Sequence, residues 1–220
     1  MNTLLKKIIW PVMAVPAIFL ALVWKKLPEK IALHFDLAGN ADRFGSKNEL
    51  VTATLILTAM NILVYLAMTN IYRIEPKKYA VENKNRLQLM GFAVAVFMAA
   101  ITGMIIYTAF KGSSRFDIKL ILAGVGFLFA FMGNYMLNIK PNYFVGFRLP
   151  WTLENAGNWK KTHAVAGRLW FAGGLFLAII CLFLPTVIAM IFFFTVMTII
   201  VIIPCVYSYR MYKNQKISGT

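Results

Sequence analysis

The chain has 220 residues, of which 60% are hydrophobic and only 14% are charged. A soluble domain of this size carries more charge on its surface, so soluble enzymes and soluble regulators are excluded. The net charge of +15 is spread over separate loops, and direct binding to nucleic acid is not expected.

Six apolar stretches are long enough, or nearly so, to cross a hydrocarbon core that takes about 20 helical residues. They lie at Ile8–Trp24, Val51–Tyr72, Leu87–Phe110, Ile118–Ile139, Leu169–Leu184 and Thr186–Tyr207. Lipid offers no partner to an unpaired backbone group, so helices are expected. We expect residues 1–220 to form a single integral membrane domain, an all-α polytopic protein with six transmembrane helices.

The distribution of Lys and Arg predicts the topology. Fifteen of them fall on one side of the membrane and eight on the other if all six stretches span it. The richer side is expected to be cytoplasmic, which places both termini in the cytoplasm. The basic excess would then lie beside anionic lipids of the inner leaflet.

The first loop, residues 25–50, should face outward and be ordered. Pro28 ends the first helix, and Gly39 with Asn40 marks a turn. The residues between them alternate in the manner of a half-buried strand, with Ile31, Leu33, Phe35 and Leu37 on the apolar face. A short hairpin capping the membrane domain is therefore expected.

The same loop holds a weak candidate for a metal site, made of His34, Asp36 and Asp42. Imidazole and carboxylate groups suit zinc or a similar ion. The alternative is a polar turn held by capping hydrogen bonds. We expect the latter, and no cofactor.

Within the spans the notable residues are small or neutral. Ala95, Ala99 and Gly103 form a stripe at four-residue spacing that favours close approach of another helix. Asn134 and Asn138 are expected on one face of the fourth helix, either in interhelical hydrogen bonds or lining a polar cavity. No charged residue stands in the middle of a span, which disfavours ion-coupled transport.

The loop at 140–168, here called the signature loop, is aromatic and basic and should be cytoplasmic. Arg148 can grip a phosphate or carboxylate with two hydrogen bonds, Thr152 is a candidate N-cap, and Trp159 and His163 would share a helix face. The segment is either an interfacial connector anchored by Trp or a recognition surface for a partner. A third alternative, catalysis with His163 as base, lacks a nearby nucleophile.

The signature loop also carries a resemblance. Residues 142–153, NYFVGFRLPWTL, followed by Trp159-Lys-Lys-Thr-His163 and Gly167-Arg168, are similar to the signature of the SdpI family of bacterial membrane proteins. Upstream, Leu27-Pro28, His34-Phe35, Gly39, Asp42 and Gly45-Ser46-Lys47 resemble a domain of unknown function often found ahead of that signature.

The resemblance implies a non-enzymatic protein of the bacterial cytoplasmic membrane. The name-giving member of the family protects a bacillus from the toxic peptide SdpC and draws the repressor SdpR to the membrane. Immunity to a peptide toxin, with or without such signalling, is therefore the leading hypothesis. A small-solute transporter or channel is the alternative, and a membrane-embedded hydrolase comes third.

The implied partners are membrane lipids, a peptide toxin and a cytoplasmic repressor. The residues expected to bind a partner or to signal are Asn134, Asn142, Tyr143, Gly146, Arg148, Pro150, Trp151, Thr152, Trp159, Thr162, His163 and Arg168. In the outer loop they are Pro28, His34, Phe35, Gly39, Asp42 and Lys47.

Overall fold

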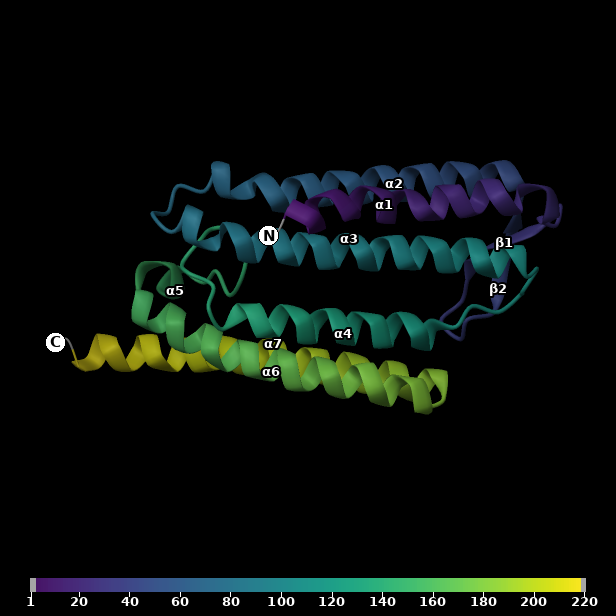
Figure 1. Ribbon diagram of the computed structural model, residues 1–220. Coiled ribbons are helices and arrows are strands. Elements are labelled where there is room, and N and C mark those ends of the chain that lie inside the picture. The colour runs from purple at the N-terminus through teal and green to yellow at the C-terminus, as the bar shows by residue number, and fades with distance from the viewer. Residues whose placement is uncertain (1–2, 219–220) are drawn as a thin grey trace. The chain divides into compact units, whose positions relative to one another are not determined.

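The computed structural model describes residues 3–218, and these are mostly helical (Figure 1). The long helices are α1 (Thr3–Val23), α2 (Lys47–Asn70), α3 (Ala80–Phe110), α4 (Ile118–Met136), α6 (Ala156–Phe183) and α7 (Thr186–Ser218). The short elements are η1 (Trp24–Lys26), β1 (Ile31–Phe35), β2 (Ala41–Gly45), η2 (Ile71–Arg73) and α5 (Pro150–Glu154). Within the described residues six helices are long and apolar enough to cross a membrane. The all-α polytopic class is confirmed.

Several helix ends differ from the expected ones. α3 begins at Ala80 rather than Leu87 and α7 runs to Ser218, whereas α6 begins at Ala156, ahead of its apolar stretch and in line with the helix expected at Trp159 and His163. Hydropathy detects only the apolar part of a helix, so polar turns at the ends are missed. α4 ends at Met136, so the expectation that Asn138 shares a helix face with Asn134 is wrong.

The chain forms two compact units, each described by itself. The first unit contains the chain up to Met68 together with Gly91–Ile121. The second unit contains Thr69–Met90 together with the chain from Leu122 onward. In the first unit α1, α2 and α3 share two apolar clusters. One lies around Ile9, Met13, Tyr65 and Ala95, and the other around Leu20, Ile31, Leu50 and Ile106.

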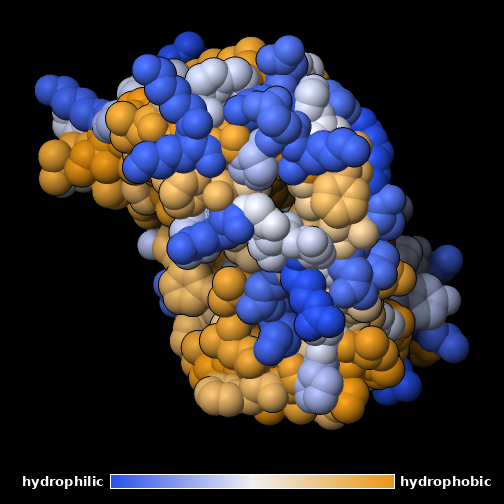
Figure 2. All heavy atoms as spheres, turned by 90° about the vertical axis from the view of Figure 1, so that its right-hand side faces the viewer, coloured by the Kyte–Doolittle hydropathy of each residue, from blue (hydrophilic) through white to orange (hydrophobic). Residues whose placement is uncertain are grey.

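The hairpin, β1 with β2, belongs to the first unit and confirms that the first loop is ordered. Its strands are antiparallel, and Gly39 takes a φ of +85° in the turn. The turn pairs with the segment before α4, because Ala41 N donates to Ser114 O (2.8 Å) and Phe116 N donates to Gly39 O (2.8 Å). Figure 2 shows the face that includes the hairpin, where hydrophilic and hydrophobic side chains both lie at the surface.

The second unit depends on glycines for its helix packing. Gly126 and Gly133 of α4 meet Gly174 and Gly167 of α6, and a Cβ added at Gly133 would lie 2.5 Å from Phe171 N. This close approach lets two backbones touch. By contrast, the predicted stripe ends at Gly103, where a Cβ would meet no atom within 4 Å. The expectation of close approach at Gly103 is wrong.

Candidate functional site

The signature loop leaves α4 in a tight turn centred on Asn142. The Asn142 Oδ1 atom accepts hydrogen bonds from the amides of Phe144 (2.9 Å) and Val145 (2.7 Å). Its amide group donates to Lys140 O (2.9 Å) and Val145 O (3.1 Å). Asn142 is buried. These four hydrogen bonds to backbone atoms fix the conformation of the turn.

Residues in and just before the start of α3 hold the same turn from outside. The buried Asn83 side chain donates to Lys140 O (3.0 Å) and accepts from Lys140 N (2.9 Å). Glu75 accepts from Tyr143 N (2.9 Å), and Lys77 lies 5.0 Å from the Tyr143 ring centroid. The signature loop is therefore fixed by partners more than 50 residues earlier in the chain.

Gly146 and His163 form the closest contact of the site. Gly146 has a φ of +108°, and a Cβ there would lie 2.2 Å from His163 Nε2. A side chain is thus excluded both by the backbone conformation and by space. The adjacent Phe147 amide donates to His163 Nε2 (3.0 Å).

The hydrogen bonds of His163 also define its tautomer. Its Nδ1 lies 2.8 Å from Trp159 O, and a carbonyl can only accept, so Nδ1 carries the proton. Nε2 accepts from an amide, so this imidazole is neutral with both nitrogens engaged. Trp159 stacks on it with ring centroids 3.9 Å apart, which confirms the shared helix face.

Thr152 lies inside α5, and its prediction as an N-cap is wrong. Pro150 starts the helix, because its fixed φ suits the first helical position. The buried Thr152 hydroxyl accepts from Leu149 N (3.0 Å) and lies 2.6 Å from Phe147 O. The N-cap of α6 is Asn155, whose side chain accepts from Asn158 N (2.8 Å).

Buried polar groups continue from the signature loop to α7. Asn158 donates to Ser208 O (3.0 Å) and accepts from the Thr162 hydroxyl (2.9 Å). The Trp151 indole donates to Ser208 Oγ (3.0 Å) and its ring stacks with Tyr212 (5.6 Å between centroids). Trp159 donates to Ile139 O (2.8 Å). These contacts tie α5, α6 and α7 together.

The exposed members of the expected set form a second group. Arg148 is exposed and donates one hydrogen bond to Tyr143 O (2.8 Å). Asn134, Tyr143, Pro150 and Arg168 are also exposed. These side chains are open to a partner without a change in conformation, and Trp151 is partly exposed as well.

The expected outer-loop residues serve the hairpin and its entry to α2. His34 Nδ1 lies 2.6 Å from Asp42 Oδ1, Phe35 packs on Phe116 with centroids 5.2 Å apart, and Lys47 pairs with Glu29 (3.1 Å). Pro28 lies beside Gly112, and a Cβ at Gly39 would meet Phe116 O at 2.3 Å.

Asp36 does not join His34 and Asp42. Its carboxylate accepts from the amides of Asn40 (2.8 Å) and Ala38 (2.9 Å). The hydrogen bond from the Asn40 amide is the main reason that the pKa of Asp36 lies below its ordinary value. Among residues 3–218, no group of three His, Cys, Asp or Glu could hold a metal ion.

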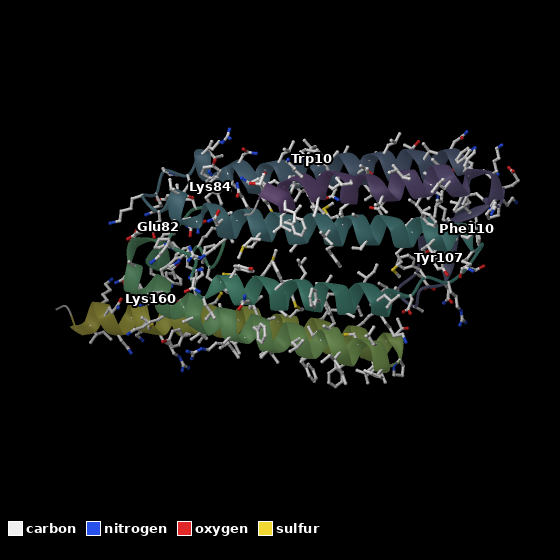
Figure 3. All side chains as sticks on the ribbon, in the orientation of Figure 1. Trp10, Glu82, Lys84, Tyr107, Phe110 and Lys160 are labelled. Atoms are coloured by element: carbon white, nitrogen blue, oxygen red, sulfur yellow. The ribbon has the colours of Figure 1, made fainter. Side chains whose placement is uncertain are left out.

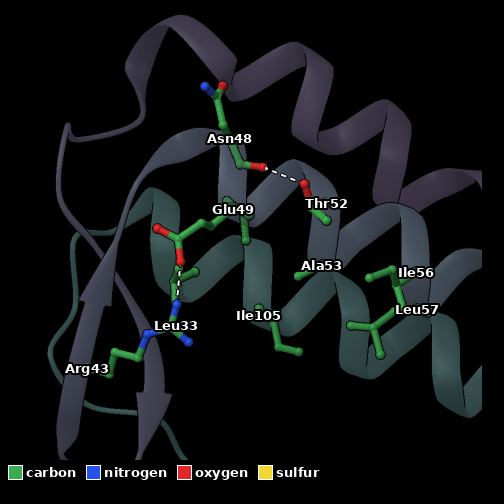
Figure 4. A pocket seen from close by; sticks show the side chains of 10 residues that line it. Leu33, Arg43, Asn48, Glu49, Thr52, Ala53, Ile56, Leu57 and Ile105 are labelled. Carbon is green, nitrogen blue, oxygen red and sulfur yellow. Dashed lines mark hydrogen bonds and ion pairs between the residues drawn. The ribbon is translucent and has the colours of Figure 1, made fainter.

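An apolar groove opens beside the hairpin in the first unit. It has a volume of about 640 Å³ and is lined by Leu33, Arg43, Asn48, Glu49, Leu50, Thr52, Ala53, Ile56, Leu57 and Ile105. Figure 4 shows Arg43 joined to Glu49 among these apolar side chains. Ser46 and Glu49 also cap α2, because Ser46 N donates to Glu49 (3.0 Å).

Several residues of the site were missed by sequence reasoning. Glu75, Asn83 and Ser208 gave no signal, because a lone polar residue near a span end is indistinguishable from solvated surface. The glycines of α4 and α6 did leave a signal, since each pair is seven residues apart. That spacing places both members on one helix face.

Comparison with known proteins confirms the resemblance. Residues 138–208 match the SdpI/YfhL protein family, and residues 12–58 match a domain of unknown function, DUF1648. The chain is 31% identical over 105 residues to the immunity protein SdpI of Bacillus subtilis (strain 168), covering 47% of this chain and 49% of that protein. The chain thus spans about half the length of this curated relative. No solved structure matches.

Proposed function

We propose that this chain is a bacterial membrane protein that gives its host immunity to a secreted antimicrobial peptide toxin. The observation that carries the proposal is the 31% identity to an immunity protein, together with the family match across the signature loop. Protection in this proposal comes from binding the peptide. In this proposal the chain lies in the cytoplasmic membrane and both termini are in the cytoplasm.

The geometry of His163 supports binding rather than hydrolysis. Both of its nitrogens are engaged in backbone hydrogen bonds, and its ring is buried under Trp159. A general base needs a free lone pair within reach of the substrate proton.

The groove of the first unit is the proposed place for the peptide. Its lining is largely apolar, and its volume of about 640 Å³ lies in the range of ligand-binding clefts. An apolar peptide segment entering it would bury the exposed Ile56 side chain and lie beside the Arg43–Glu49 pair. Burial of apolar surface supplies the binding energy.

The test is survival of a sensitive bacterium that expresses the chain and is challenged with an SDP-type toxic peptide. Ala53→Phe fills the groove and should abolish protection. Ala59→Phe is the matched control, because Ala59 is an exposed alanine of α2 outside the groove lining. No protection by the unaltered chain would overturn the function, whereas protection by Ala53→Phe at equal membrane abundance would overturn only the groove.

Signalling through a cytoplasmic repressor is the second proposed function. It is supported by the exposed Arg148, whose guanidinium donates one hydrogen bond to Tyr143 O and can also bind a carboxylate. Arg148→Ala should insert normally and lose capture of a co-expressed repressor at the membrane, while Lys161→Ala, at an exposed lysine of the same signature loop, should keep it. Equal capture by both variants would leave Arg148 as an anchor.

Transport remains the alternative, and two buried atoms of the first unit favour it. Thr58 Oγ1 and Asn61 Oδ1 on α2 have no hydrogen-bond partner, and a passing solute or water could supply one. Solute flux into proteoliposomes that is lost in Asn61→Leu would support a channel. Flux equal to that of empty liposomes would dismiss it.

A further inference from the structure

A small cavity in the second unit lies where three membrane-spanning helices end. It has a volume of about 270 Å³ and is lined by Tyr79, Arg86, Leu137, Asn138, Ile139, Lys140, Pro141, Ala156, Trp159 and Lys160. These residues come from the start of α3, the segment after α4 and the start of α6. We call it the basic cavity.

The charged residues that line the basic cavity are all positive. Arg86, Lys140 and Lys160 line it, and no acidic residue does. Three cations gathered around one hollow repel one another unless an anion lies between them. Ala156 is the first residue of α6, so the positive end of that helix dipole adds to the same field.

Several groups that line the basic cavity are held in place by other contacts. Lys140 is held through its backbone by both polar atoms of the Asn83 amide group. The Trp159 indole is fixed by its hydrogen bond to Ile139 O and by stacking on His163. Arg86 is half-buried, and one of its nitrogens donates to Glu82 O (3.0 Å). The groups left to order on binding are the exposed side chains of Lys140 and Lys160.

The size of the cavity and its place at the ends of the spans indicate the class of ligand. Its volume lies just below the usual range for drug-sized ligands, which suits a phosphate-bearing headgroup and excludes a folded peptide. Arg, Lys and a Tyr hydroxyl are the usual partners of a phosphate. Ends of membrane spans lie at the level of lipid headgroups, and Figure 3 shows Lys160 at the same end of this unit as Glu82 and Lys84.

We propose that the basic cavity binds a phosphate-bearing anion, with an anionic phospholipid headgroup and free phosphate as its two sources. This site is separate from the groove assigned to the peptide. It requires neither immunity nor signalling.

The test uses the full chain in detergent and measures binding by native mass spectrometry and by thermal shift. The probes are dihexanoyl phosphatidylglycerol, dihexanoyl phosphatidylcholine and inorganic phosphate. Binding of the glycerol lipid alone supports a lipid site, and binding of phosphate as well supports a general anion site. Equal binding of the glycerol and choline lipids, or binding of none of the probes, would overturn the proposal.

A charge-matched pair of double variants separates the cavity from bulk electrostatics. Arg86→Gln with Lys160→Gln removes two lining cations and should weaken anion binding at least about tenfold. Lys84→Gln with Lys161→Gln removes two cations from the same helices outside the lining and should change it less than about twofold. An equal loss in both pairs would overturn the site, provided that both melt like the unaltered chain without ligand.

Discussion

The signature loop and the hairpin are both rich in polar residues, but these residues are buried in the first and exposed in the second. In the signature loop, Asn142, Thr152 and His163 are buried and bond to backbone atoms. In the hairpin, His34 and Asp42 pair with each other while about half or more of each side chain stays exposed. Leaving a buried polar group unpaired lowers the free energy of unfolding. Substitutions of polar residues should therefore destabilise the signature loop strongly and the hairpin only slightly.

The difference also separates structural residues from binding residues. A motif that is dense in polar and aromatic side chains predicts a site, but most of those side chains here build the loop itself. Arg148 and Arg168 are exposed, so their side chains are available to a partner. Substitutions in the two regions test whether buried polar residues of the signature loop contribute more to stability than exposed ones of the hairpin.

The largest effect is expected for Gly146→Ala in the signature loop. The new Cβ would meet His163 Nε2 at 2.2 Å with the backbone at a φ of +108°, so the loop must move. We expect a loss of about 3 kcal/mol or more in the free energy of unfolding. Thermal unfolding of the purified protein in detergent measures it.

Gly103→Ala is the control for this substitution. A Cβ at Gly103 meets no atom within 4 Å, and alanine favours the helix by about 1 kcal/mol. Gly103→Ala should therefore melt at or above the temperature of the unaltered chain. If Gly146→Ala did the same, the tight contact with His163 would not exist in the protein.

Thr152→Val should have the next largest effect. The substitution keeps the shape but removes the hydroxyl that accepts from Leu149 N and contacts Phe147 O. Leaving these buried groups unpaired should cost about 1–3 kcal/mol. Thr52→Val, at an exposed hydroxyl on α2, should stay within about 0.5 kcal/mol. Equal melting of the two variants would remove the contrast between buried and exposed hydroxyls.

Sequence reasoning found what depends on composition and local spacing. The six apolar helices, the hairpin at residues 31–45 and the Trp159–His163 pair follow from hydropathy, alternation and helix period. The polar start of α3 did not, because hydropathy carries no information about a helix once it leaves the apolar layer.

The rest of the site could not be predicted because it depends on long-range pairing. Asn83 recognises Lys140 across 57 residues, and Trp151 reaches Ser208 across 57 residues. Each single residue is unremarkable in the sequence. Only the fold brings the two members of each pair together, so their role appears in the structure alone.

The smallest effects are expected in the hairpin. His34→Gln should change the free energy of unfolding by about 1 kcal/mol or less, because exposed ion pairs contribute little. The measurement is thermal unfolding, and Asn83→Leu in the second unit provides the contrast, since it removes both hydrogen bonds to Lys140. A loss in His34→Gln as large as in Asn83→Leu would show that the hairpin pair supports more of the fold than its exposure indicates.

The hairpin turn should nevertheless respond to acid through Asp36. The pKa of its carboxyl is lowered in the fold, mainly by the hydrogen bond from the Asn40 amide. A lowered pKa means that the ionised form stabilises the turn above the ordinary pKa of about 3.9, and that this contribution is lost as the pH falls through the folded value. The Asn40 amide chemical shift, followed by NMR below about pH 5, should titrate in the unaltered chain and stay flat in Asp36→Asn. Titration above the ordinary pKa would reverse the sign, and would mean that the turn does not hold the ionised carboxylate.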